Sequence, residues 1–298
     1  MTTLTAPALS SDSHPSLLSR ALPYLALAGS VVSYCVGTSF AKQLFPLVGA
    51  VGTVTYRVGF AALILLAVFR PWRQPISRSD LLATMRYGAV LGMMNFCFYM
   101  ALRTIPLGLA IAIEFLGPLT VSLLHSRRPS HFAMVGLAAT GLALLLPLHA
   151  GAHTLDPVGV AFGLGAGLCW GLYIVFGKRI GHLPGGQAVA LGMTTAALVV
   201  VPMGVHAAGT SLLAPSLMAM GLLTAITSSA VPYSLEMIAL RRIPASQFGI
   251  LLSVEPAIGA IAGMLLLGEH LTGMQWLAVA LVVMASVGSV LPGGKKAN

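Results

Sequence analysis

Ten runs of mostly apolar residues follow one another along the chain, and only short polar breaks separate them. A helix needs about 20 apolar residues to cross the ~30 Å hydrocarbon core of a bilayer, and each run is long enough. Only 8% of all residues are charged, against about 25% in a soluble domain. The sequence therefore predicts an all-α polytopic membrane protein. Its ten expected transmembrane helices cover residues 22–42, 51–69, 83–103, 106–125, 131–149, 157–177, 186–206, 215–240, 245–267 and 273–291.

The segments outside these runs are short. Residues 1–20 are rich in Ser and Pro and predict a disordered tail, and residues 293–298 form a second short tail. The first apolar run continues past the small residues of ALAGS, so we expect an uncleaved first helix. No segment between the runs is long enough for a soluble domain.

Lys and Arg are distributed unevenly over the breaks. With the N-terminus in the cytoplasm, thirteen of the sixteen fall on the cytoplasmic side and two, Lys42 and Arg103, fall outside. Cytoplasmic loops of membrane proteins carry this excess, so we expect both termini and both tails in the cytoplasm. The net charge of +9 then indicates contact with anionic lipid and not with nucleic acid.

Two stretches of the chain resemble each other. ALRTIPLGLAIAIEFLGP begins at Ala101 and ALRRIPASQFGILLSVEP begins at Ala239, 138 residues later. The shared arginine and two shared prolines at fixed spacing indicate an internal duplication, with five helices in residues 21–150 and five in 156–292. Because five is odd, the second repeat enters the membrane upside down. Two inverted five-helix repeats are typical of secondary transporters, whose substrate site lies near the midplane.

Three of the seven acidic residues fall inside apolar runs. Glu114 lies about 12 Å along its helix and Glu255 about 16 Å along its own, so both approach the membrane midplane. Glu236 lies nearer an interface. A charged carboxylate at this depth costs on the order of 3 kcal/mol, so it usually faces a cavity or a partner, or takes up a proton. The three are candidates for substrate binding or proton coupling, and the alternative is a purely structural hydrogen bond.

Three prolines predict breaks in the helices. A proline within a helix leaves the carbonyl four residues earlier without its donor. Pro118 frees the carbonyl of Glu114, Pro256 that of Leu252, and Pro232 that of Ser228. Freed carbonyls at membrane depth face protein or water, and they can bind an ammonium group. The alternative is a kink that serves packing alone.

Arg57 is the only cation well inside an apolar run. It could pair with Glu114 or Glu255, or bind a substrate carboxylate, and the sequence leaves both open. Four further residues could line a pocket or serve packing: Asn95, Tyr99, Trp170 and Tyr173.

The sequence offers no catalytic constellation. GLYIVFGKR has the wrong glycine spacing for a phosphate-binding loop, and the histidines lack metal-ligand spacing. We therefore expect no enzyme, no cofactor and no metal site. A passive channel is not excluded by an inverted repeat, and the sequence leaves a homodimer open.

Several motifs resemble the drug/metabolite transporter superfamily in its EamA-like branch. EPAIGAIAGMLLLGEHLT, from Glu255 to Thr272, is similar to the late signature of that branch. KQLFPLVGAVGTVTYRVG, IPLGLAIAIEFLGPL, GAGLCWGLYI and VPYSLEMIALRRIP resemble the threonine/homoserine exporters, and the resemblance extends from Pro23 to Pro292.

This resemblance implies export of small amino acids across the bacterial inner membrane, with protons as the counter-substrate. Arg57 would bind the carboxylate of the amino acid, Glu114 would bind its ammonium group, and Glu255 would carry the proton. A broader drug or metabolite exporter of the same fold is the alternative.

Overall fold

A computed structural model describes residues 17–124, 129–145, 155–240, 242–243 and 251–290. Within these residues the chain is helical and has no strand. The first half contains α1 (Leu17–Gln43), α2 (Phe45–Phe69), η1 (Pro71–Arg73), α3 (Arg78–Ala101), α4 (Leu107–Glu114), α5 (Leu116–Leu124) and α6 (Pro129–Leu145). The second half contains α7 (Pro157–Arg179), α8 (Gly185–Ala208), η2 (Gly209–Leu213), α9 (Pro215–Ala225), η3 (Ile226–Ala230), α10 (Val231–Leu240), α12 (Glu255–Leu267) and α13 (Gly273–Val290).

The helices confirm the predicted class, an all-helical polytopic membrane protein. Six of the described helices are long and apolar enough to cross a membrane, and three more are apolar but shorter. Many large apolar side chains are exposed on the outside of the bundle, among them Leu63, Leu168, Leu198 and Leu265. Exposed apolar surface on this scale is unusual for a soluble protein, and lipid accounts for it.

The predicted boundaries hold to within a few residues at most ends. Helix α1 begins at Leu17, so the last four residues of the predicted disordered tail, 17–20, are helical. Residues 1–16, the C-terminal tail 293–298 and the first residues of the predicted span 245–267 lie outside the described residues.

Two predicted spans are interrupted at aligned positions of the repeated stretch. The span 106–125 breaks at Phe115, between α4 and α5, and the span 245–267 breaks at residues 253–254, just before α12. Each break lies two to three residues before a shared proline, Pro118 or Pro256. The proline ring and its missing N–H exclude the helical hydrogen bond at this point. Glu114 therefore ends one short helix, and Glu255 begins another.

A third interruption lies in the span 215–240. Residues Ile226–Ala230 form a π-helical turn, η3, directly before Pro232 in α10. Such turns are rare and occur frequently at functional sites. In α2, Gly49 has φ 72° and ψ 171°, a conformation that needs glycine, and the helix restarts after it.

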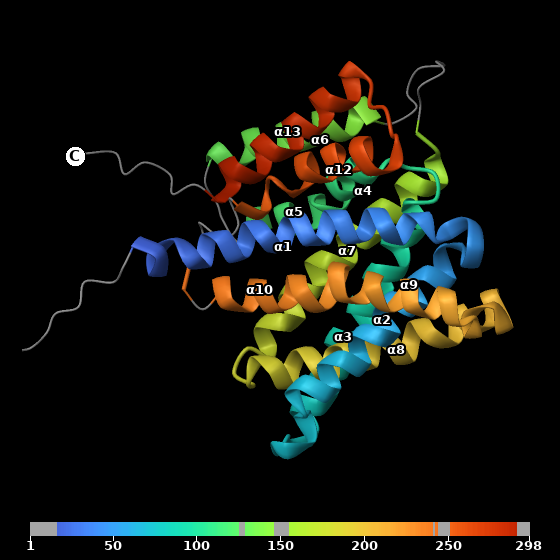
Figure 1. Cartoon of the computed structure of the whole chain (residues 1–298). Coiled ribbons are helices and arrows are strands. Elements are labelled where there is room, and N and C mark those ends of the chain that lie inside the picture. Colours follow the sequence, from blue (N-terminus) through green and yellow to red (C-terminus); the bar gives the residue numbers. More distant parts are fainter. Residues whose placement is uncertain (1–16, 125–128, 146–154, 241, 244–250, 291–298) are drawn as a thin grey trace, which may run out of the picture.

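Corresponding spans of the two halves pack against each other. Helix α2 contacts α8, α4 contacts α12, and α6 contacts α13, which lies beside it in Figure 1. Helix α3 packs on α7, as α1 packs on α10. In the predicted repeats α1 corresponds to α7 and α3 corresponds to α10, so a two-fold axis between the halves would relate the α3–α7 contact to the α1–α10 contact. The inverted orientation and the boundaries of the two repeats stay predictions.

Hydrogen bonds mark two ends of the bundle. At one end, His182 Nε2 lies 3.1 Å from Asp80 Oδ1, and Gln187 Nε2 donates to the carbonyl of Gln74. At the other end, Lys42 binds Glu269, and Thr104 Oγ1 donates to Asp156. The distribution of Lys and Arg places the first end in the cytoplasm, and that orientation stays a prediction.

Candidate functional site

Arg57 lies at the centre of the bundle and is almost completely buried. Its Nε donates to Ser229 Oγ at 3.0 Å, and its Nη2 donates to the carbonyl of Ser228 at 3.1 Å. The guanidinium carbon lies 5.2 Å from the ring centroid of Tyr34 and 5.3 Å from that of Tyr99. The rings and the serines hold the plane of the guanidinium in place. Nη1 is also buried, and within the described residues it has no hydrogen-bond partner.

The Ser228 carbonyl is available to Arg57 because of Pro232. The sequence predicted that Pro232 frees this carbonyl, and the structure shows a side-chain cation taking the place of the missing backbone donor. The π-helical turn is also held from the other side, where Ser33 Oγ of α1 donates to the Thr227 carbonyl at 2.7 Å. Of the three predicted carbonyls, this one is already bound by the protein.

Glu114 is buried at the last position of α4. The helix comes very close to α7 here, because a Cβ added to Gly167 would lie 2.8 Å from the Glu114 carbonyl oxygen. Only a glycine lets the two backbones approach in this way. Phe115, at the break itself, packs edge to face on Trp170 with 5.1 Å between the ring centroids.

Glu255 is buried in the first turn of α12, and Cys35 Sγ of α1 lies 3.9 Å from its carbonyl oxygen. Glu114 and Glu255 both lie close enough to Arg57 for their charges to interact with it. Among the described residues, however, no salt bridge joins Arg57 to either carboxylate. Of the two roles that the sequence left open for Arg57, the resting ion pair is therefore not observed.

Glu236 lies one turn beyond Pro232 and faces α1. Its Oε1 accepts a hydrogen bond from Ser30 Oγ at 2.9 Å. The Glu236 charge also acts on Tyr173 and Tyr233. The carboxylate is therefore held by a partly buried hydrogen bond, as in the structural alternative.

The other predicted pocket residues have different surroundings. Tyr99 contacts Arg57, as described above. Tyr173 stacks on Tyr87 with 4.7 Å between the ring centroids. Asn95 is buried, and its Nδ2 donates to the Leu91 carbonyl of its own helix at 2.8 Å, which occupies one of its donors locally.

Sequence reasoning named the Ser228 carbonyl but missed two residues of this site, Tyr34 and Ser229. Ser229 carries a signal, because TSSAVP places hydroxyls just before a helical proline. Tyr34 carries none, since its place opposite Arg57 depends on how α1 packs against α2 and η3.

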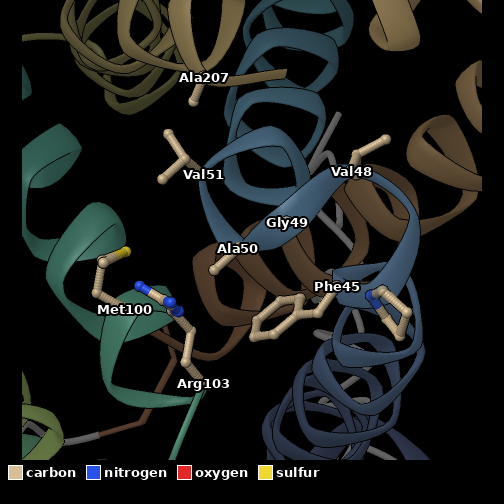
Figure 2. A pocket seen from close by; sticks show the side chains of 9 residues that line it. Phe45, Val48, Gly49, Ala50, Val51, Met100, Arg103 and Ala207 are labelled. Carbon is tan, nitrogen blue, oxygen red and sulfur yellow. The ribbon is translucent and has the colours of Figure 1, made fainter.

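A separate cavity of about 450 Å³ opens at the end of the bundle that we expect to face outside. Phe45, Gly49, Met100, Arg103 and Ala207 contribute to its wall. Figure 2 shows the Arg103 side chain extending from the end of α3 toward Ala50, just past the break in α2 at Gly49. The cavity does not include any of the residues around Arg57.

Comparison with known proteins identifies the family. Residues 157–291 match the model of the EamA-like transporter family. The threonine/homoserine exporter RhtA of Escherichia coli (strain K12) is 48% identical over 270 residues, which are 91% of this chain and 92% of that protein. RhtA of Salmonella typhimurium (strain LT2) matches with the same identity and the same coverage.

The chain belongs to the threonine/homoserine exporter family of EamA-like transporters. This membership confirms the resemblance to the drug/metabolite transporter superfamily. A crystal structure with 20% sequence identity superposes with a TM-score of 0.57 and covers 91% of this chain and 96% of the other. That likeness supports the fold. This EamA-like transporter is therefore a multi-pass bacterial membrane protein and not an enzyme.

Proposed function

We propose that this transporter exports threonine, homoserine or close analogues by exchange with protons, with the site facing each side of the membrane in turn. Its relatives that are 48% identical over nine-tenths of the chain are named threonine/homoserine exporters. The observation that carries the mechanism is the buried Arg57 guanidinium, whose Nη1 has no hydrogen-bond partner among the described residues and which forms no salt bridge with Glu114 or Glu255.

This arrangement matches the charges of an amino-acid zwitterion. Nη1 of Arg57 binds the substrate carboxylate, since a guanidinium already fixed by Ser228, Ser229 and two rings loses little freedom on binding. Glu114 binds the ammonium group through its carboxylate, which is buried at the end of α4. Trp170, which packs on Phe115 next to Glu114, would contact the short apolar part of the substrate.

We assign the proton to Glu255. This carboxylate is buried in the first turn of α12, and its place in the sequence puts it nearest the membrane midplane. Uptake of a proton from outside and its release to the cytoplasm then biases the two orientations of the site.

Uptake into inverted membrane vesicles tests this proposal. We expect saturable uptake of labelled homoserine that depends on an imposed inside-acid pH gradient. Glu114→Gln and Glu255→Gln should abolish uptake while the protein stays folded in the membrane. Asp80→Asn, the same change in a carboxylate outside the site, is the matched control and should leave uptake intact.

Two results would contradict the assignment. Normal uptake by Glu114→Gln would remove Glu114 from the mechanism. No homoserine uptake by folded wild-type protein, together with resistance of cells to unrelated amphiphiles, would favour the broader drug or metabolite exporter. Flux that does not saturate would indicate a channel.

A further inference from the structure

A second polar network joins three elements at the end of the bundle that we expect to face outside. Lys42 Nζ, at the end of α1, lies 2.6 Å from Glu269 Oε1, which follows α12. Lys42 Nζ also donates to the Ile105 carbonyl at 3.1 Å. Glu269 Oε2 accepts from the backbone N–H of Leu107, the first residue of α4, at 2.8 Å. One carboxylate thus ties α1, α4 and α12 together.

Helices α4 and α12 both run from this network to the site. Helix α4 begins at Leu107 in the network and ends at Glu114, about 10 Å away at ~1.5 Å per residue. Helix α12 begins at Glu255 and ends directly before Gly268 and Glu269. The two helices are in tight contact, since a Cβ on Gly108 would meet the backbone of Ala260. A displacement of either glutamate is therefore transmitted to the network.

The third element also reaches the site. Helix α1 carries Lys42 at its end and Tyr34 in contact with Arg57. Separation of α1 from α4 and α12 would open a path from the site to the outside, and the Lys42–Glu269 pair opposes that separation.

The burial of the ion pair suits a contact that must form and break. The side chains of Lys42 and Glu269 are 21% and 11% exposed. Fully exposed pairs contribute little to stability, so such a pair would barely bias the conformations. Breaking a fully buried pair is strongly destabilising, so such a pair would hold the end shut. A partly buried pair lies between these limits, and water can reach both charges when the helices part.

Glu269 is also held in a defined direction. Gly268 adopts φ 66° and ends α12, and the backbone N–H of Glu269 donates to the Gly263 carbonyl at 3.1 Å. This helix-end motif directs the carboxylate back toward α4. The sequence places Lys42 at the end of the predicted span 22–42 and Glu269 between two spans, and it indicates no contact between them, because 227 residues separate the two.

We propose that Lys42 and Glu269 are the gating pair on the outer side of the transporter, closed in this structure, and that α4 and α12 couple the pair to Glu114 and Glu255. The pair positions the helices and does not touch the substrate. This inference rests on the proposed function, in which the site must face each side in turn.

A reversible cross-link tests the proposal. Lys42→Cys and Glu269→Cys are combined in a chain in which Cys35, Cys97 and Cys169 are replaced by alanine. A short linker with two thiol-reactive ends then joins the two new cysteines through disulfide bonds, which can be reduced. We expect the linker to abolish homoserine uptake in inverted vesicles and dithiothreitol to restore it. A pair with a merely structural role would tolerate the linker, so undiminished uptake would overturn the proposal.

The control cross-link uses Asp80→Cys and His182→Cys at the opposite end. These residues join α3 and α7, which pack along their length, so the linker should not change uptake. Loss of uptake in this control as well would mean that any linker stops transport, and the result at Lys42 would then count against the specific assignment.

A third measurement does not depend on the substrate. Hydrogen exchange in the outer ends of α4 and α12 should be roughly 5- to 150-fold faster in Glu269→Gln than in wild type, which corresponds to a typical coupling between conformations. Asp80→Asn should not change it. If the wild-type protein does not transport homoserine, the proposed function fails, and the hydrogen-exchange measurement by itself tests the gating role of Lys42 and Glu269. An unchanged rate of hydrogen exchange in Glu269→Gln would refute that role.

Discussion

Replacing Gly167 by alanine tests the close approach of α7 to α4 at the site. The added methyl carbon would lie 2.8 Å from the Glu114 carbonyl oxygen and 3.4 Å from its carbonyl carbon. A carbon in a C–H···O contact lies about 3.3 Å or more from the oxygen, so the two backbones must separate by roughly 0.5 Å. Overpacking of this kind costs about 1–3 kcal/mol.

Gly165 in the same helix provides a matched control. A methyl group there would lie 3.6 Å from Cys97 Sγ, an ordinary contact. Both substitutions gain the same helix propensity, up to about 1 kcal/mol, so the difference between them isolates the steric cost.

We expect the thermal midpoint of Gly167→Ala in detergent to fall below that of Gly165→Ala by roughly 2–12 °C. Homoserine uptake should fall with it, because the displaced backbone shifts Glu114 from its place in the site. Equal midpoints and equal uptake in the two variants would refute the argument that glycine at 167 positions Glu114.

Three further predictions concern the site and the outer end. Arg57→Lys keeps the positive charge but loses the planar arrangement of donors. We expect the KM for homoserine to rise roughly 10- to 150-fold, which corresponds to the loss of one charged hydrogen bond of about 1.5–3 kcal/mol. An unchanged KM in vesicle uptake would show that Arg57 does not bind the substrate carboxylate. Pro118→Ala restores a donor to the Glu114 carbonyl, so we expect a protein that is more stable by about 1 kcal/mol and transports more slowly, and faster uptake would contradict a role for the break. Hydrogen bonds from Thr104 Oγ1 and from the backbone N–H of Gly159 lower the pKa of the Asp156 carboxyl in the folded protein. The ionised carboxylate therefore stabilises the fold at pH values above its pKa in the unfolded chain, and this contribution is lost as the pH falls through the lower pKa of the folded protein. Asp156→Asn should therefore unfold at a lower temperature than wild type at pH 7 and at the same temperature at a pH below the folded-state pKa.

The helical spans and their breaks were predictable because each depends on local chemistry. Transfer of about 20 apolar residues into hydrocarbon favours a helix wherever the run is long enough. A proline cannot donate a hydrogen bond to the carbonyl four residues before it. The sequence therefore predicted an interruption near each of three prolines, Pro118, Pro232 and Pro256. The rarity of charge inside the runs also identified Arg57 and the three glutamates.

Contacts between distant segments were not predictable. The sequence left open whether Arg57 pairs with a carboxylate, and it offered no reason to expect Ser229, 172 residues away, as its partner. The partners of Asn95 and Tyr173 also depend on which helix faces lie together. Nothing in a single sequence reports that packing.

The sequence by itself determined a helical membrane protein with duplicated stretches, broken spans and a few ionisable residues at membrane depth, because hydrophobic transfer and proline geometry act within one segment. Only the tertiary structure decided that Arg57 is held by Tyr34, Tyr99 and the π-helical turn. It alone decided that Lys42 and Glu269 meet across the two halves. Both outcomes follow from the close approach of helix backbones at small residues, which depends on the shapes of two surfaces at once.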